Sequence, residues 1–220
     1  MPKFAIQLLS MPLFYQHDIN RGTKLGVWQI EETEDFFLEK VPLKKDVSHP
    51  HKRLQHLAGR YLLPFLFPDF PVGEIVIADT RKPFLQSETY HFSISHCGQF
   101  AAAIVSTERR VGIDVEYIRP RIQHISHKFL AEEESIFLKG LNNSRYLEFL
   151  TLIWSAKEAI YKWHGLGEID FKENIQLGGA ISFQENDFLE LPFFFSKGGK
   201  IPLVVNAKIF DDLSLAWLAT

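Results

Sequence analysis

The sequence predicts an α+β protein in which a helical segment is followed by antiparallel strands twice along the chain. Apolar residues recur at helical spacing over residues 51–67 and again over 145–164. Short runs of alternating apolar and polar residues come after each of these segments, and the links between the runs are short and polar. The two halves therefore share an order of elements, although no sequence repeat accompanies it.

The composition is that of a folded protein. Hydrophobic residues make up 46% of the 220 residues and include 20 Phe and 4 Trp, enough to bury the core of one large domain or two small ones. The midpoint has no linker rich in Pro, Gly or Ser, so we expect the halves to pack closely. A formal net charge of −3 argues against a general nucleic-acid binder, which needs broad basic patches. Any phosphate chemistry must therefore depend on a few local cations.

The cysteine count and the apolar stretches bear on where the protein resides. The single cysteine, Cys97, excludes an intramolecular disulfide framework and fits a reducing cytoplasm. The N-terminus lacks the pattern of a signal peptide. The most apolar stretch, residues 61–70, is too short to span a bilayer and is interrupted by Pro64 and Pro68. We therefore expect a soluble cytoplasmic protein that contacts neither membranes nor nucleic acid.

The first half is expected to begin with strands at residues 4–9 and 25–30. A helix follows over residues 51–67, where the apolar side chains repeat every three to four positions. Three alternating runs come next, at residues 90–95, 100–106 and 111–117. Because the links between these runs are short and polar, an antiparallel meander is the most economical pairing.

The second half is expected to begin with two helices, at residues 123–139 and 145–164. Gly165 and Gly167 should end the second helix, since glycine commonly follows a helix C-terminus. The expected strands then lie near residues 180–184, 191–195, 203–210 and 213–219.

The strand expected at residues 111–117 carries two carboxylates on one face. Asp114 and Glu116 alternate with apolar residues, and residues two apart on a strand lie about 7 Å apart on the same face. Two carboxylates so placed suit magnesium, which takes its remaining ligands from water and substrate phosphates. An ordinary solvent-facing strand would show the same alternation, so the pair alone leaves both interpretations open.

The second long helix contains a lysine in an unusual position. At about 100° per residue, Lys157 falls near the middle of an apolar arc, while Glu158 and Lys162 lie at its edge, one turn apart. A lysine among apolar neighbours is costly unless it extends to solvent or meets a negative partner. A surface-reaching lysine beside an i,i+4 ion pair is the alternative interpretation of this helix.

The turn after residues 92–95 could bind phosphate. Ser93 and Ser95 face away from the core and His96 stands at the strand end, where hydroxyl and imidazole groups make good phosphate donors. If the meander holds, this turn lies beside the two carboxylates. The G-x-S-x-G elbow of many serine nucleophiles is missing. Cys97 and His96 point to opposite faces of the strand, which argues against a catalytic pair.

Other cations and histidines are less informative. A single basic residue is more often a solvated surface charge than a ligand contact, and the histidines lack a convincing zinc spacing. The basic residues are Lys52, Arg53, Arg60, Arg81 and Lys82, and the histidines are His49, His51 and His56.

Three motifs, taken together and in this order, resemble those of the Sfp-type 4′-phosphopantetheinyl transferases of the holo-[acyl-carrier-protein] synthase superfamily. Residues 92–98 read F-S-I-S-H-C-G. Residues 111–116, V-G-I-D-V-E, are similar to the family's G-I-D-x-E, and residues 154–165, W-S-A-K-E-A-I-Y-K-W-H-G, to its W-x-x-K-E-x-x-x-K. Residues 57–60, L-A-G-R, resemble part of the family's first long helix. Residues 81–83, R-K-P, resemble its G-K-P turn, with arginine in place of glycine.

The resemblance covers about residues 53–165 and implies a fold and a function. The fold would consist of two similar halves related by a pseudo-two-fold, with coenzyme A and the metal in the cleft between them. Residues 1–112 would form the N-terminal half, which contacts coenzyme A. Residues 113–220 would form the C-terminal half, with the metal ligands and the catalytic helix.

The metal ligands and catalytic residues follow by position in the motifs. The resemblance implies Mg²⁺ held by Asp114, Glu116 and Glu158. Glu158 would also be the general base, acting directly or through water. Lys157 would neutralise charge on the leaving phosphate or protonate it, which would account for a lysine within the apolar arc.

The coenzyme A contacts also follow by position. Arg53 and Arg60 are both candidates for the 3′-phosphate, and their spacing from Gly59 does not decide between them. The full set of expected contacts is His96, Ser95, Lys162, Arg53, Arg60 and Lys82.

The implied reaction transfers the 4′-phosphopantetheine arm of coenzyme A to a serine of an acyl or peptidyl carrier protein and releases adenosine 3′,5′-bisphosphate. The alternatives are a non-catalytic member of the fold that binds coenzyme A or the carrier, and another magnesium enzyme such as a phosphohydrolase. We expect a monomer, because the chain already contains two halves. The carrier would contact the surface near residues 123–137, which includes Phe129 and Leu130.

Overall fold

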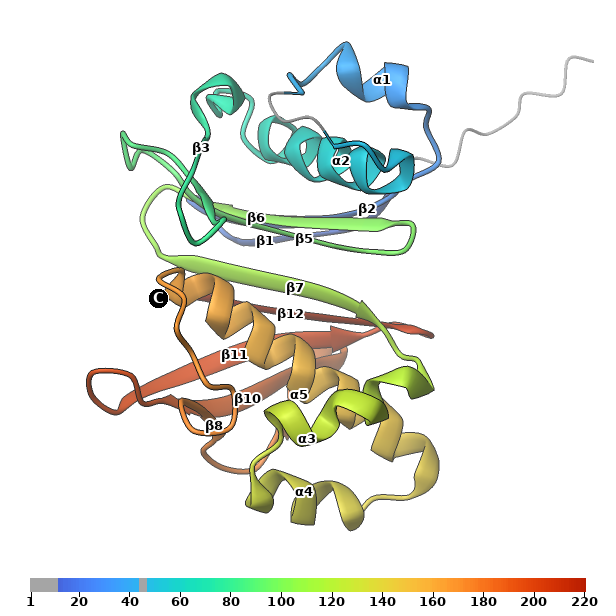
Figure 1. The fold of residues 1–220 in the computed structure, drawn as a ribbon, viewed down its shortest axis with the longest axis vertical. Helices are drawn as coiled ribbons and strands as arrows, with labels where there is room; N and C mark the ends of the chain where they lie inside the picture. Colours follow the sequence, from blue (N-terminus) through green and yellow to red (C-terminus); the bar gives the residue numbers. More distant parts are fainter. Residues whose placement is uncertain (1–11, 44–46) are drawn as a thin grey trace, which may run out of the picture.

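The computed structural model describes residues 12–43 and 47–220, and its architecture confirms the α+β class. Two antiparallel sheets lie face to face, and a long helix covers the outer face of each (Figure 1). The strand expected at residues 4–9 lies outside the described residues. None of the helices in residues 12–43 and 47–220 has the length and apolar character that crossing a membrane requires.

The first sheet has the strand order β1-β2-β6-β5. Strands β2 (Thr23–Gln29), β6 (Phe100–Ser106) and β5 (His91–Cys97) lie where the sequence predicted strands, and each pairs antiparallel with its neighbour. The edge strand β1 (Leu13–Asn20) was not predicted. Its alternation is masked by the consecutive polar residues Gln16, His17 and Asp18, and its inner face is only partly buried.

Helix α2 (Pro50–Leu66) covers the outer face of this sheet, as residues 51–67 predicted. Its buried leucines pack on the small side chains of β6, and the helix comes so close to β5 that a Cβ on Gly59 would lie 2.6 Å from Ile94. The short helix α1 (Glu34–Leu38) lies against α2. The link to β5 contains η1 (Val72–Glu74) and the strand pair β3 (Val76–Ile77) and β4 (Pro83–Phe84).

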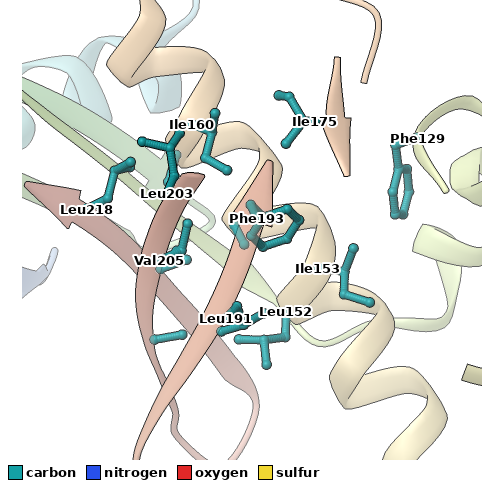
Figure 2. Packing of buried hydrophobic residues seen from close by; sticks show 14 of the residues in the cluster. Phe129, Leu152, Ile153, Ile160, Ile175, Leu191, Phe193, Leu203, Val205 and Leu218 are labelled. Atoms are coloured by element: carbon teal, nitrogen blue, oxygen red, sulfur yellow. The ribbon is translucent and has the colours of Figure 1, made fainter. Parts of the chain in front are cut away.

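The second sheet has the order β7-β12-β11-β10-β8, and the short β9 pairs with β10. Helix α5 (Asn143–His164) crosses its outer face, where Ile153 and Ile160 pack on Leu191, Phe193 and Leu203 (Figure 2). Gly165 ends α5 in the left-handed conformation with a φ of 72°, as expected. The strands are β7 (Val111–Tyr117), β8 (Ile175–Leu177), β9 (Ser182–Phe183), β10 (Phe188–Phe195), β11 (Ile201–Ile209) and β12 (Leu213–Ala219).

The predicted meander of the first half is confirmed for β5 and β6, which pair antiparallel, but it is wrong for β7, which leaves the first sheet. It pairs antiparallel with β12 of the second sheet and lies along β5 through side chains. The amide of Ile113 donates to Ser93 Oγ at 3.2 Å, and the amide of Tyr117 donates to Cys97 Sγ at 3.3 Å. Side chains of β5 thus take the place of a backbone ladder, and β7 forms the seam between the sheets.

The single helix predicted over residues 123–139 is also wrong. The segment consists of η2 (Pro120–Ile125), α3 (Ser126–Phe129) and, after a break, α4 (Glu132–Lys139). At the break, the amide of Ala131 donates to the Glu134 carboxylate at 2.8 Å. A side-chain acceptor for the first free amides is the feature that begins a new helix, so Glu134 explains the interruption.

Gly112 is required where β7 meets α5. A Cβ at this position would lie 2.0 Å from the carbonyl oxygen of Ala159 and 2.9 Å from the amide nitrogen of Trp163. Both contacts are with helix backbone, so no side-chain rotation can relieve them. This close approach brings the carboxylates of β7 next to the polar edge of α5.

We expect Gly112→Ala to destabilise the protein by about 3 kcal/mol or more, at the upper end of overpacking costs. Urea unfolding of the variant and the parent measures the difference. Gly73→Ala is the matched control, because no atom lies within 4 Å of a Cβ built there. A Gly112→Ala variant within about 0.5 kcal/mol of the parent would contradict the close approach.

Candidate active site

Three polar side chains from β5, β7 and α5 meet at the seam between the sheets. Lys162 Nζ donates to Asp114 Oδ1 at 2.7 Å and to Ser95 Oγ at 2.8 Å. The Ser95 hydroxyl donates to the same Asp114 oxygen at 2.7 Å. The sequence motifs placed these residues on three separate segments, and the structure brings all three together.

Asp114 is the most buried member of this cluster, with 3% of its surface exposed. Its Oδ1 accepts two hydrogen bonds, whereas its buried Oδ2 has no hydrogen-bond partner within the described part of the chain. A buried carboxylate oxygen without a donor is costly. It is therefore a candidate ligand atom for a cation.

Glu116, two residues along β7, is held by a tryptophan. Trp154 Nε1 donates to Glu116 Oε1 at 3.3 Å from α5. Burial raises the pKa of Glu116, and the negative charge of Asp114 raises it further. The Trp154 bond and Lys162 act in the opposite direction. The sequence had placed Trp154 in a motif without assigning it a role.

Glu158 completes a group of three carboxylates. Burial raises its pKa to about 7, and the charges of Asp114 and Glu116 add to this increase, while Lys162 opposes it. Three carboxylates thus face one ammonium group. The excess of negative charge in a partly dry site is the electrostatic signature of a cation site or of a tuned acid–base group.

The donor set fits magnesium, although the carboxylates are not gathered around one point. Among the described residues, no three His, Cys, Asp or Glu side chains are arranged to hold a metal ion. The unpartnered Asp114 Oδ2 and the mutual repulsion that raises the pKa of Glu116 and Glu158 are both features that a hard cation would relieve. An all-oxygen donor set of this kind is typical of Mg²⁺.

A cavity of about 200 Å³ opens next to the carboxylates. Segments from both halves of the chain line it: residues 80–83 and 92–94 from the first half, and the last turn of α5 with Gly165 and Gly167 from the second. Lys162 belongs both to the lining and to the carboxylate cluster. Lys162 therefore connects the cavity to the carboxylate cluster.

Lys82 also lines this cavity. Its Nζ donates to the Trp163 carbonyl at 3.4 Å, at the C-terminus of α5. Burial lowers the pKa of Lys82 to about 8, and the nearby positive charge of Arg110 contributes. A bound anion would reverse both effects, so the position suits a phosphate contact.

His96 stands at the exposed end of β5, one residue after Ser95. Loss of hydration lowers the pKa of its imidazole, and the charge of Lys162 lowers it further. Asp114 acts in the opposite direction. His96 is thus close enough to the cluster for the charges of Lys162 and Asp114 to shift its pKa.

The two arginines on α2 have protein partners. Arg53 forms a two-pronged ion pair with Glu34, at 2.6 and 2.8 Å, and also donates to the Val47 carbonyl. Arg60 is 8% exposed and contacts the His56 ring, and burial lowers its pKa. The structure does not bring either guanidinium into the carboxylate cluster.

Lys157 is placed differently from the expectation. It has no exposed surface, and its Nζ donates to Glu134 Oε2 at 2.7 Å and to the carbonyls of Phe129 and Phe171. All three N–H groups have protein acceptors, so none remains to protonate or neutralise a leaving phosphate. The sequence predicted that a lysine in the apolar arc needs a negative partner, and this partner is Glu134. Glu134 was not identified from the sequence because it lies in a run of three glutamates.

Two further expectations concern Phe129 and Cys97. Phe129 and Leu130 were expected to contact the carrier, but they are only 1% and 7% exposed, so these two residues are wrong as contacts; the wider surface of residues 123–137 stays a prediction. The Phe129 ring packs on Trp154 instead. Burial raises the pKa of the Cys97 thiol to about 12, which agrees with the argument against a Cys97–His96 catalytic pair.

The family model agrees with the motifs. Residues 110–199, which contain all three carboxylates, match the sequence model of the 4′-phosphopantetheinyl transferase superfamily. The resemblance inferred from the motifs is thereby confirmed.

Curated relatives agree with the family model. The chain is 32% identical over 126 residues to the 4′-phosphopantetheinyl transferase AcpT of Escherichia coli O157:H7, covering 56% of this chain and 64% of the relative. It is 30% identical over 111 residues to enterobactin synthase component D of Salmonella austin, covering 50% and 47%. A 4′-phosphopantetheinyl transferase of Bacillus subtilis is 29% identical over 92 residues, 41% of each chain. The chain therefore spans less than two thirds of the length of these relatives.

Proposed function

We propose that this chain is an Sfp-type 4′-phosphopantetheinyl transferase that uses Mg²⁺ to move the phosphopantetheine arm of coenzyme A onto a serine of an acyl or peptidyl carrier protein. The observation that carries the proposal is the group of Asp114, Glu116 and Glu158 beside Lys162. Lys162, which donates to Asp114, also lines the cavity, and all three carboxylates lie within a segment that matches the superfamily. The cytoplasm as location and the monomer as working state belong to the same proposal.

The three carboxylates would hold the metal, with Asp114 Oδ2 free to bind it. When bound, Mg²⁺ would neutralise phosphate charge that otherwise repels the attacking hydroxyl. Glu158 would take the proton of the carrier serine, directly or through one water. A carboxyl whose pKa is raised to about 7 is a stronger base than an ordinary glutamate and is still largely ionised just above neutral pH.

The cations around the cavity would bind the phosphates of coenzyme A. The serine oxygen attacks the β-phosphorus, and the bond to the bridging oxygen breaks to release adenosine 3′,5′-bisphosphate. Lys162 stabilises the charge that develops, because its ammonium reaches both the cavity and the carboxylates. Ser95, His96 and Lys82 are the proposed phosphate contacts nearest to it, and Arg53 or Arg60 would take the 3′-phosphate.

The two sheets would correspond to the two halves of the chain that the resemblance implies. In this proposal, residues 1–112 supply most coenzyme A contacts and residues 113–220 supply the metal ligands, as a pseudo-two-fold arrangement implies. The seam at β7 supports it, since Asp114 on β7 receives hydrogen bonds from β5 on one side and α5 on the other.

Mass spectrometry of a carrier protein tests the proposal. An apo carrier incubated with the chain, coenzyme A and Mg²⁺ is expected to gain the mass of one phosphopantetheine arm, and EDTA is expected to abolish the gain. A carrier whose acceptor serine is replaced by alanine is the control. No gain on acyl and peptidyl carriers, with coenzyme A still bound by the chain, would favour the non-catalytic alternative. Carrier-independent release of adenosine 3′,5′-bisphosphate would favour a phosphohydrolase.

The raised pKa of Glu158 predicts how the stability of the metal-free protein depends on pH. A carboxyl whose pKa is higher in the folded state binds its proton more tightly there, so its contribution to stability falls as pH rises from about 4.5 to about 7. Thermal melts in EDTA are expected to show Tm falling over this range. Adding Mg²⁺ should raise Tm more at pH 8 than at pH 5, because the ionised carboxylates bind the cation.

The variant Glu158→Gln isolates this contribution. It should reduce the decline of Tm between pH 5 and pH 8 in EDTA, because glutamine does not ionise. A decline as steep as that of the parent would assign the pH dependence to other groups.

A further inference from the structure

The Lys157–Glu134 ion pair is fully enclosed by the protein. The exposed fractions of the two side chains are 0% and 2%. Lys157 Nζ donates to Glu134 Oε2 at 2.7 Å, to the Phe129 carbonyl at 2.6 Å and to the Phe171 carbonyl at 3.0 Å. All three N–H groups of Lys157 therefore have protein acceptors. This holds although Lys157 is adjacent in sequence to Glu158, the proposed general base.

Glu134 has its own further partners. Its Oε2 also accepts the amide of Ala131 at 2.8 Å, and its Oε1 accepts the amide of Leu177 at 2.9 Å. One ion pair thus ties four segments to α5: the end of α3, the start of α4, the loop containing Phe171 and strand β8. No other ion pair within the described residues is as deeply buried.

The two carbonyls that bind Lys157 belong to residues whose rings hold Trp154. The Phe129 ring lies 4.9 Å from the Trp154 ring, between centroids, and the Phe171 ring is stacked on it at 5.5 Å and 24°. The same indole donates from Nε1 to Glu116 Oε1. A continuous series of contacts therefore runs from the ion pair to a carboxylate of the candidate metal site.

We propose that the Lys157–Glu134 pair is a positioning element that holds the Trp154 indole and, through it, the Glu116 carboxylate in place for metal binding. The inference rests on the proposed function. Lys157 is then a positioning residue, because it acts through Phe129, Phe171 and Trp154 and touches neither coenzyme A nor the carrier.

The physical reason is the fixed geometry of the two carbonyls. Removing the ammonium leaves the carbonyls of Phe129 and Phe171 and the Glu134 carboxylate without a charged donor in a dry environment. The backbone of both phenylalanines must then move to find new partners, and their rings move with it. An indole that loses these two ring contacts no longer presents its N–H to Glu116 in one direction.

Metal affinity is the property that separates this role from a catalytic one. Loss of a group that orients a metal ligand typically costs 10–100-fold in metal affinity. Loss of a lysine that acts on the leaving phosphate would instead lower kcat at saturating metal. Direct binding of Mn²⁺, followed by electron paramagnetic resonance with the full chain and coenzyme A, measures the affinity without reference to activity.

Three variants test the series of contacts at different points. Glu134→Gln removes the charge and keeps one of the two acceptor oxygens, Lys157→Met removes the ammonium, and Phe171→Leu removes one ring while leaving the ion pair intact. Each is expected to raise the Kd for Mn²⁺ by roughly 10–100-fold. At saturating metal, kcat should stay within about threefold of the parent. Lys197→Met, a lysine of the same half that pairs with exposed Glu168, should change neither quantity.

Two results would overturn the inference alone. One is a folded Phe171→Leu or Glu134→Gln variant that binds Mn²⁺ as the parent does, which would make the pair purely structural. The other is a large loss of kcat in Lys157→Met at saturating metal with unchanged Mn²⁺ affinity. If Lys157→Met does not fold, Phe171→Leu decides, because it retains the pair. A parent chain that binds no Mn²⁺ would overturn the proposed metal site and this inference together.

Discussion

Replacing Glu158 by glutamine is expected to lower the rate of phosphopantetheine transfer by roughly 10³-fold at saturating Mg²⁺, within the range for loss of a general base. Glutamine has nearly the same shape but neither takes a proton nor contributes a negative charge to the metal. The loss should appear in kcat, because the serine proton is removed in the transition state rather than on binding. The rate of formation of the modified carrier, followed by mass spectrometry, provides the measurement.

The pH profile makes this result specific to Glu158. In the parent, the rate should fall on the acidic side as the carboxylate, whose pKa is raised to about 7 in the metal-free site, becomes protonated. The residual activity of Glu158→Gln should lack this acidic limb. Glu148→Gln, on the same helix and outside the carboxylate group, is the matched control and should keep both the rate and the profile. Retention of the acidic limb in Glu158→Gln would assign the base to another residue.

Replacing Asp114 by asparagine is expected to lower the rate at a fixed, low Mg²⁺ concentration by about 100-fold or more. Asp114 supplies the unpartnered oxygen proposed to bind the metal and is the anionic partner of Lys162. The loss of one strong charge-assisted contact, about 3 kcal/mol, corresponds to about 100-fold. A Mg²⁺ titration of the rate measures the effect.

The titration also separates Asp114 from Glu158. Raising the Mg²⁺ concentration should partly restore the rate of Asp114→Asn, because a weakened site can still be filled, whereas it should not restore Glu158→Gln. Asp212→Asn serves as the control, since Asp212 forms an exposed ion pair with Arg119 at 2.6 Å, away from the cavity. An Asp114→Asn variant with the parent's Mg²⁺ dependence would exclude Asp114 as a ligand.

Local periodicity by itself determined on which faces of β7 and α5 the site residues lie. The alternation in β7 placed Asp114 and Glu116 on one face, and helical spacing placed Glu158 and Lys162 one turn apart on α5. Such placements depend on the backbone geometry of one element, which a short stretch of sequence specifies. The order of three motifs then indicated the superfamily that the comparison with residues 110–199 confirms.

The partners of these elements were decided only by the tertiary structure. Strand β7 pairs with β12, about a hundred residues later, rather than with its neighbour β6, because its apolar face is buried between two sheets. Lys157 donates to Glu134, and Phe129 turns inward to Trp154. In each case a residue's neighbours come from distant segments, and the free energy of burying them together, which no local pattern records, selects the contact.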